Sequence, residues 1–424
     1  MSTNRLAVVF GGGTVQWFAN HLALCTPHRG NTARKLYDKI EQDWPEMDPV
    51  LCMTKYAIDS TDHEKNLFTE FDVESNEDLQ RVVDQYVNNS LTKVIFFSSA
   101  VLDYHASFDD LPLDQQHKYG KRFSTREQPE LDLKLKTCDK IIKTIRSKRK
   151  DVFLVGFKQT SGATEDEQYI AGLGLCKESS CNLVLANDSV TRTNMIITPE
   201  EARYHVTKDR DEALASLLHM TKLRSHLTFT RSTVVSGEPV PWSSPEVPES
   251  LRKVVDHCIA EGAYKPFNGS TVGHFAVKLN DTTFLTSQRK TNFNDLSDIG
   301  LVKIETDGPD TVIAYGSKPS VGGQSQRIVF NEHPEMDCIA HFHCPIREGS
   351  EVPQVSQYEY ECGSHQCGDN TSKNLKQFGN LKAVYLQEHG PNIVFNRNID
   401  PQEVIDFIEA NFDLSKKTGG LVSL

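Results

Sequence analysis

The sequence lacks long apolar runs, and no stretch approaches the roughly 18 residues that are needed to span a bilayer. Its start runs directly into a Val-Val-Phe segment, without the basic region, apolar core and small-residue cleavage site of a secretion signal. The ten cysteines are scattered over 424 residues, which fits reduced thiols better than a disulfide framework. These absences argue against membrane-spanning and secreted classes and predict a soluble, cytoplasmic protein.

The sequence also has fewer basic than acidic residues: 46 Lys and Arg and 58 Asp and Glu give a net charge of −12. A surface that neutralises nucleic-acid phosphates needs clustered Lys and Arg. The one basic run, residues 146–150, is short and is expected to form a solvated helix face. We therefore predict no nucleic-acid or membrane partner, whereas small anionic ligands need only a local positive pocket.

The length indicates two domains. Residues 6–227 alternate short apolar segments with longer amphipathic ones, which predicts an α/β domain with a Rossmann-like, doubly wound parallel sheet. Its strands are expected at residues 6–10, 93–98, 151–157 and 182–186. Residues 235–250 contain four prolines and four serines and are expected to be a linker. The predicted domains are therefore 1–234 and 251–424.

Shorter strands between terminal helices are expected after the linker. Helices are predicted at residues 248–261 and 401–412, and strands at residues 271–278, 283–286, 301–305, 311–315, 339–343 and 383–386. This order is compatible with an α/β/α domain.

A glycine-rich turn, Gly11-Gly12-Gly13-Thr14, directly follows the first predicted strand. Such a turn lets backbone N–H groups approach an anion at the start of the next helix, although a tight turn uses the same residues. The dinucleotide fingerprint and the P-loop lysine pattern are both absent. Further segments at or near predicted strand ends would meet this turn at one crevice of the sheet. They contain Asp103, Phe157, Asn187 and Asp188.

This series over residues 5–220 resembles phosphopantothenate-cysteine ligase. The resemblance implies that Gly11 to Thr14, Asp103, Phe157, Asn187 and Asp188 bind CTP or ATP with Mg²⁺, and that a carboxylic acid is activated for attack by an amine. It also implies that Lys121 neutralises the activated acyl phosphate. Asn20 is the preferred residue for holding the acyl intermediate and Asn31 is a second candidate, since the usual Ser-Ser-Gly-like turn is missing.

Three histidines in the second half could bind one metal. His341 and His343 are two residues apart on a predicted strand, so their side chains share one side, and His389 follows another strand. Three neutral nitrogens with an open position are typical of catalytic zinc. An ordinary hydrogen-bonded histidine pair is the alternative.

The segments around these histidines resemble the class II aldolase and adducin family over residues 251–412. The resemblance implies zinc, or a similar divalent metal, at His341, His343 and His389. It further implies that the phosphate of a sugar phosphate is bound by Asn268, Gly269, Thr286, Ser287 and Ser320. The proton-shuttling glutamate of the aldolases is replaced by Gly322, and Glu332 and Glu388 are candidate substitutes. Adducin-like members of this family are not aldolases, so a binding role also stays open.

Two smaller features complete the sequence-based hypothesis. Cys362, His365 and Cys367 could form a second metal site or a reactive thiol, but free thiols in a polar loop are the preferred interpretation. Both resembled families usually form oligomers, so a homo-oligomer is expected. The leading hypothesis is a bifunctional ligase and metal-dependent enzyme. In one alternative only the aldolase-like half is catalytic, as a lyase, dehydratase or epimerase, and the nucleotide-binding half regulates it. In the other alternative the chain is a non-enzymatic binding or assembly protein.

Overall fold

The computed structural model describes residues 5–108, 116–127, 129–320 and 323–418. The chain forms two compact units. Unit 1 contains Met1–Ile197 and Tyr204–Ser225, and unit 2 contains Thr198–Arg203 and His226–Leu424. None of the described helices is long and apolar enough to cross a membrane.

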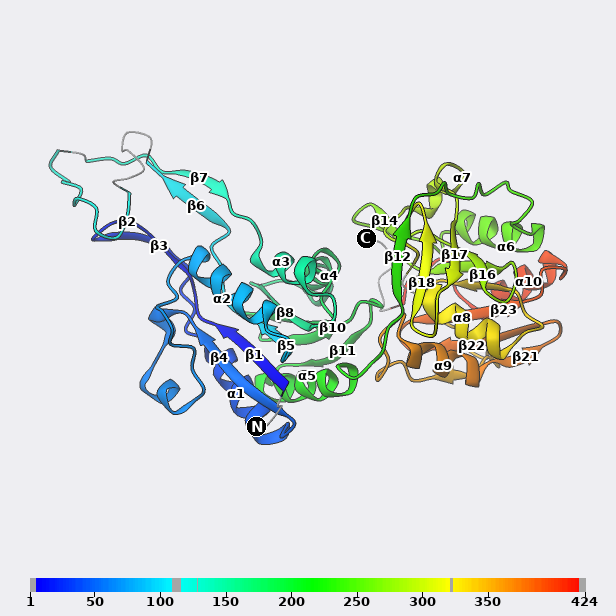
Figure 1. Ribbon diagram of the computed structural model, residues 1–424, viewed down its shortest axis with the longest axis horizontal. Helices are drawn as coiled ribbons and strands as arrows, with labels where there is room; N and C mark the ends of the chain where they lie inside the picture. The colour runs from blue at the N-terminus through cyan, green and yellow to red at the C-terminus, as the bar shows by residue number, and fades with distance from the viewer. Residues whose placement is uncertain (1–4, 109–115, 128, 321–322, 419–424) are drawn as a thin grey trace. The chain divides into compact units, whose positions relative to one another are not determined.

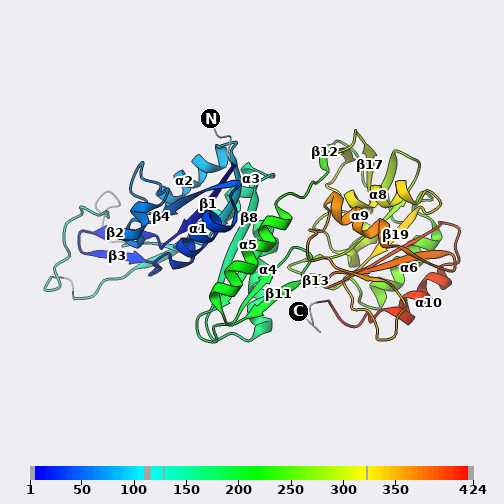
Figure 2. The same ribbon diagram turned by 90° about the horizontal axis from the view of Figure 1, so that it is seen from below.

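Unit 1 contains a seven-stranded sheet in the order β11-β10-β9-β8-β5-β1-β4 (Figures 1 and 2). The strands are β1 (Arg5–Gly11), β4 (Met47–Met53), β5 (Thr92–Phe97), β8 (Phe153–Thr160), β9 (Leu183–Asp188), β10 (Asn194–Ile197) and β11 (Arg203–Thr207). The five strands from β4 to β9 are parallel, whereas β10 pairs with β9 in the antiparallel direction. All four strands predicted for this half are present.

Helices cover both faces of this sheet, as predicted for a doubly wound fold. Contacts join α1 (Asn31–Asp43) to α5 (Arg210–Arg224), and join α3 (Ile141–Lys148) to both α2 (Asn76–Asn88) and α4 (Glu165–Ser179). The strands between them are continuous apolar runs such as Ala7 to Phe10, all fully buried, as is expected when both faces of a sheet are covered. The basic run is solvated, as predicted, at the exposed Lys148 and Lys150, whereas the half-buried Arg146 and Arg149 donate to backbone carbonyls such as those of Val152 and Val87.

Two hairpins form an extension of unit 1, which we call the arm (Figure 1). It consists of β2 (Val15–Ala19) with β3 (Leu22–Cys25), β6 (Tyr104–Ser107) with β7 (Lys134–Thr137), and residues 116–127. Gln16 joins the hairpins, because its side-chain amide donates to and accepts from the backbone of Ala106. Phe18, Ala106 and Phe108 form a small core within the arm.

Unit 2 contains a ten-stranded, mainly antiparallel sheet, along which the strand order is β12-β18-β17-β16-β15-β19-β23-β22-β20, with β21 beside β22. Its strands are β12 (Arg231–Val235), β15 (His274–Lys278), β16 (Thr283–Thr286), β17 (Val302–Thr306), β18 (Thr311–Tyr315), β19 (Cys338–His341), β20 (Gln354–Val355), β21 (Lys376–Phe378), β22 (Leu381–Leu386) and β23 (Gly390–Phe395). A short hairpin, β13 (Pro266–Phe267) with β14 (Ser270–Thr271), stands apart from this sheet.

Helices pack on both faces of this second sheet, in agreement with the predicted α/β/α layers. One large core contains residues of α6 (Glu249–Ala260) and α10 (Pro401–Asn411), and a second core contains residues of α8 (Gly323–Glu332), which packs beside α9 (His365–Asn374). A short helix, α7 (Leu296–Ile299), lies in the connection before β17. Both faces of the sheet are therefore buried, and a ligand-binding site is expected at the ends of its strands.

The structure places the division of the chain elsewhere than the predicted boundaries at 234 and 251. The unit boundary lies between Ser225 and His226, and residues 235–250 belong to unit 2. Trp242 and Val247 are buried in its large core, and the Val240 N–H donates to the Leu301 carbonyl at 2.8 Å. Prolines and serines prevent a helix here, but they do not prevent an extended segment from packing on a core.

Candidate functional site

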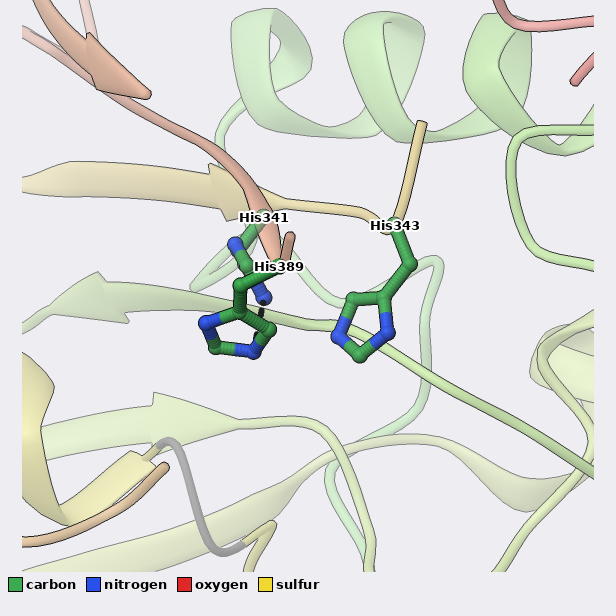
Figure 3. A group of neighbouring side chains, drawn as sticks. All are labelled: His341, His343 and His389. Carbon is green, nitrogen blue, oxygen red and sulfur yellow. Dashed lines mark hydrogen bonds between the residues drawn. The ribbon is translucent and has the colours of Figure 1, made fainter. Parts of the chain in front are cut away.

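The three histidines predicted as metal ligands come together at the strand ends of unit 2 (Figure 3). His341 ends β19, His343 follows it, and His389 lies in the turn between β22 and β23. One ring nitrogen from each lies within 4.8 Å of the other two. The Nε2 atoms of His341 and His389 are 3.2 Å apart, close to the separation of about 3.3 Å expected for two nitrogens around tetrahedral zinc.

A glycine allows the His389 turn to approach the other two histidines. Gly390 has φ 143°, and a Cβ atom there would lie 2.1 Å from the Phe342 carbonyl oxygen. Any larger residue would push the His389 turn away from the segment that joins His341 to His343. The glycine after His389 is thus explained by backbone packing.

The environment keeps the imidazole of His341 neutral, which is the form that binds a metal. Burial, followed by the neighbouring His389, His274 and His343, lowers the pKa of His341 well below its ordinary value. Its Nδ1–H donates to the Pro391 carbonyl at 2.7 Å, which leaves the Nε2 lone pair toward His389. This donor set fits zinc or a similar divalent transition metal.

A fourth buried histidine, His274, was not singled out from the sequence. It pairs with His341 across β15 and β19, and the two rings lie 4.6 Å apart. Burial and His343 lower the pKa of His274 to about 3, so it is neutral near pH 7. Its Nδ1 contacts the Gln326 amide, and the Thr286 hydroxyl donates to that amide at 3.1 Å. The only sequence signal was a histidine at the start of an apolar strand.

Three of the predicted phosphate-binding residues lie on neighbouring segments. The Ser320 N–H donates to the Ser287 carbonyl at 2.9 Å, and Thr286 precedes Ser287. Both Thr286 and Ser287 are fully buried, and no hydrogen bond reaches the Ser287 hydroxyl from the described residues. Thr286 also connects these segments, through Gln326, to His274 beside the histidine group.

Asn268 and Gly269 occupy the turn of the β13–β14 hairpin, with φ angles of 48° and 78°. An Asn-Gly pair suits this turn without any ligand. Gly322 lies outside the described residues. The two proposed substitutes, Glu332 and Glu388, are exposed.

The cysteine-containing segment forms no metal group among the residues that the structure describes. Cys362 and Cys367 form no disulfide, and the buried Cys367 sulfur accepts from the Gln357 side-chain amide at 3.3 Å. The His365 imidazole contacts the Thr230 hydroxyl at 2.8 Å. The predicted polar loop is not observed at His365 and Cys367, because both residues lie in α9.

In unit 1 the glycine-rich turn lies at the point where the strand order reverses, between β1 and β5. Parallel sheets bind ligands at such a switch point, outside the carboxyl ends of the strands. Packing also requires small residues here, since a Cβ on Gly13 would lie 1.8 Å from the Thr26 carbonyl oxygen. The buried Thr14 hydroxyl donates to Asn76 and accepts from the Leu102 N–H, so it holds the turn itself.

Of the other predicted nucleotide-binding residues, Asp103 follows β5, Phe157 lies within β8, and Asn187 and Asp188 end β9. The carboxyl ends of these parallel strands share one edge of the sheet. Phe157 and Asn187 are partly buried, whereas Asp103 is exposed and paired with Lys140. The Asp188 carboxylate accepts hydrogen bonds from the Thr160 hydroxyl and from the backbone N–H groups of residues 162–163 and 190–191. It therefore holds together the loops that follow β8 and β9. Burial opposes ionisation of Asp188, but these hydrogen bonds outweigh it and lower the pKa well below its ordinary value.

The two predicted catalytic residues of unit 1 lie together on the arm. Asn20 is exposed in the β2–β3 turn, and its N–H contacts the carbonyl of Gly120, the neighbour of Lys121. The Lys121 side chain is also exposed. Asn31, the second candidate, begins α1, and its side-chain oxygen accepts from Arg34.

Comparison with known proteins gives structural neighbours for both halves. No protein-family profile and no curated protein sequence matches the chain. The DNA/pantothenate metabolism flavoprotein from Streptococcus pneumoniae is 19% identical, with 52% of this chain and 98% of that chain covered and a TM-score of 0.42. The C-terminal domain of the coenzyme A biosynthesis bifunctional protein CoaBC is 15% identical, with 53% and 97% covered and a TM-score of 0.39.

A second group of neighbours carries aldolase names. YgbL from Escherichia coli, named for aldolase, epimerase or decarboxylase activity, is 18% identical, with 38% of this chain and 82% of that chain covered and a TM-score of 0.28. L-fuculose 1-phosphate aldolase is 14% identical, with the same coverage and a TM-score of 0.29. Both resemblances predicted from the sequence motifs are thus represented among the structural neighbours, and both groups of neighbours belong to enzyme families.

Proposed function

We propose that the chain is a bifunctional enzyme whose second half is a metal-dependent enzyme acting on a small phosphorylated or hydroxylated substrate. The observation that carries this proposal is the group of three buried histidines whose ligand atoms lie within 4.8 Å of one another. Three buried imidazoles whose nitrogens lie this close together form a set of donors that one divalent cation can bind.

His341, His343 and His389 would hold the metal as three neutral ligands and leave one position open for substrate. When bound, a divalent metal supplies Lewis-acid polarisation of a carbonyl or hydroxyl oxygen. The buried hydroxyls of Thr286 and Ser287 and the nearby Ser320 would bind the phosphate or hydroxyl groups of the substrate. His274 packs against His341 and would help to fix its ring orientation.

Ordinary retro-aldol cleavage needs a carboxylate that moves a proton, and the sequence has Gly322 at the expected position. The exposed side chains of Glu332 and Glu388 are poor substitutes, because an effective proton carrier must stay within hydrogen-bond reach of the substrate. Lyase, dehydratase and epimerase reactions therefore stand beside aldol cleavage as candidate activities of this half.

Metal content tests this proposal directly. Protein purified without chelator is expected to contain about one zinc-class ion per chain, and His341→Ala and His389→Ala should each lose it, since two imidazoles hold a divalent ion poorly. His257→Ala is a matched control, because His257 lies on α6 outside the group. A metal-free wild type, or variants that keep the full complement, would contradict the proposal.

For the first half we propose ligation of a carboxylic acid to an amine, driven by CTP or ATP with Mg²⁺. Support comes from the glycine-rich turn at the switch point of a parallel sheet, beside the strand ends that carry Phe157 and Asn187. Pyrophosphate release that depends on nucleotide, acid and amine would support this activity. Nucleotide binding without turnover would favour a regulatory role, and ligand binding without turnover in both halves would favour a sensor or assembly protein.

We further propose that the protein is cytoplasmic and forms a homo-oligomer.

A further inference from the structure

A buried acidic side chain lies beside the histidine group and comes from a distant part of the sequence. Unit 2 includes the segment Thr198–Arg203, which connects β10 to β11. Within it, Glu201 is fully buried and has φ 70°, a left-handed conformation that few non-glycine residues adopt. Its N–H donates to the Thr198 carbonyl at 3.0 Å, and the Ala202 N–H donates to the Thr198 hydroxyl at 3.2 Å. The turn is therefore fixed internally.

The carboxylate of Glu201 contacts one of the three histidines and a buried lysine. Its Oε2 atom lies 3.4 Å from His343 Nδ1 and 2.8 Å from Lys417 Nζ. Lys417 is only 4% exposed, so each charge is compensated by the other inside unit 2. Next to Lys417, the Thr418 N–H donates to the His343 carbonyl at 3.1 Å, and its hydroxyl donates to the His389 carbonyl at 3.0 Å.

We propose that Glu201 is a positioning residue for the metal centre. It accepts a hydrogen bond from Nδ1–H of His343, and this fixes the tautomer in which Nε2 carries the lone pair. His341 is held in the same manner by the Pro391 carbonyl, so two of the three ligands have a defined outer partner. A carboxylate behind a ligating imidazole raises its basicity and fixes its ring, and such partners typically contribute 10- to 100-fold in metal affinity. Glu201 is not one of the three ligands themselves.

This inference rests on the proposed metal site and adds something that the resembled sequence motifs do not contain. The candidate substitute carboxylates, Glu332 and Glu388, lie near Gly322 and His389 in the sequence, whereas the buried carboxylate belongs to Glu201. A metal centre in residues 226–424 therefore depends on a segment from the first half of the sequence. Expression of the second half alone would remove this partner of His343.

Metal affinity of the full-length protein tests the inference. Competition with a chromophoric chelator should show that Glu201→Gln binds Zn²⁺ about 10-fold or more weakly than wild type, and the visible spectrum of bound Co²⁺ should shift. Glu201→Asp should recover part of the affinity, because it keeps the charge. The matched control is Glu388→Gln, the same change at an exposed glutamate adjacent to His389, and it should bind zinc as wild type does.

Loss of the Glu201 charge also leaves Lys417 buried beside an uncharged partner, so folding needs its own control. The double variant Glu201→Gln/Lys417→Met removes both charges, and its thermal unfolding midpoint should return toward that of wild type. If its zinc affinity also returns to the wild-type value, Glu201 serves only to balance Lys417 and the positioning role is overturned. The role is equally overturned if Glu201→Gln alone binds zinc as tightly as wild type. A wild type that takes up no metal would instead defeat the proposed metal site and this inference together.

Discussion

At the scale of single residues, Gly13 shows how one position can serve packing and ligand binding at once. The sequence indicated a phosphate-binding turn, and the structure supplies an independent reason for glycine, since a Cβ atom would lie 1.8 Å from the Thr26 carbonyl oxygen. Backbone cannot move aside as a flexible side chain can. Loss of nucleotide binding in a Gly13 variant would therefore not prove contact with phosphate.

We predict that Gly13→Ala lowers the free energy of unfolding of nucleotide-free unit 1 by about 1–3 kcal/mol, the usual cost of overpacking. Calorimetry of the full chain without nucleotide would measure this change. Gly174→Ala is the matched control, because no atom lies within 4 Å of a Cβ built at this position of α4, and alanine should leave stability unchanged or raise it. If Gly13→Ala melts as wild type does but no longer binds nucleotide, phosphate contact rather than packing explains the glycine.

At the scale of elements, residues 235–250 illustrate what composition alone misses. Four prolines and four serines correctly predict the absence of a helix, but they do not show which apolar residues between them are buried. Trp242 is 7% exposed, lies 5.6 Å from the Phe275 ring, and donates from its indole N–H to Asp256 at 2.9 Å. The segment therefore contributes buried side chains, Trp242 and Val247, to the unit 2 core.

We predict that Trp242→Ala lowers the free energy of unfolding of unit 2 by about 3–5 kcal/mol, as removal of a buried aromatic side chain usually does. Denaturant unfolding of the full chain would show the change in the transition of unit 2. Ser243→Ala, at the exposed neighbouring position, is expected to have no measurable effect. A Trp242→Ala variant as stable as wild type would restore the interpretation of this segment as a linker.

The elements that the sequence predicted well are those with a local signature. Short apolar segments predicted strands in both units, and the predicted ranges 283–286 and 311–315 coincide with β16 and β18, which pair with β17 in the antiparallel direction. The histidine group was found because two members are close in sequence and the third lies in a recognisable motif. His274 and Glu201 were missed because their roles depend on strand register and on a long-range contact, and neither has a periodic pattern.

At the scale of the whole molecule, the arm separates the two predicted catalytic residues of unit 1 from the glycine-rich turn. Asn20 and Lys121 lie at the far end of β2, whereas Thr14 lies at its start. A strand of five residues spans about 17 Å, so both ends cannot contact the same small reacting group within one chain. If both sets of residues serve one reaction, a second copy of the chain must bring its arm to the glycine-rich turn.

We therefore predict a dimer formed through the arm. The arm exposes Tyr119 at 84% and Leu135 at 51%, and Leu133, which directly precedes its strand β7, is 41% exposed. Sedimentation should show wild type as a dimer and Leu133→Glu/Leu135→Glu as a monomer, because two buried negative charges would oppose association. The monomer should still bind CTP or ATP but should lose pyrophosphate release, since the turn remains while the partner's arm is absent. Leu91→Glu changes a 43% exposed leucine that lies outside the arm and directly precedes β5, at the end of the strand opposite the glycine-rich turn, so this variant should remain dimeric and active. A monomeric wild type that releases pyrophosphate, or an active monomeric double variant, would show that Asn20 and Lys121 are not the catalytic residues of this half.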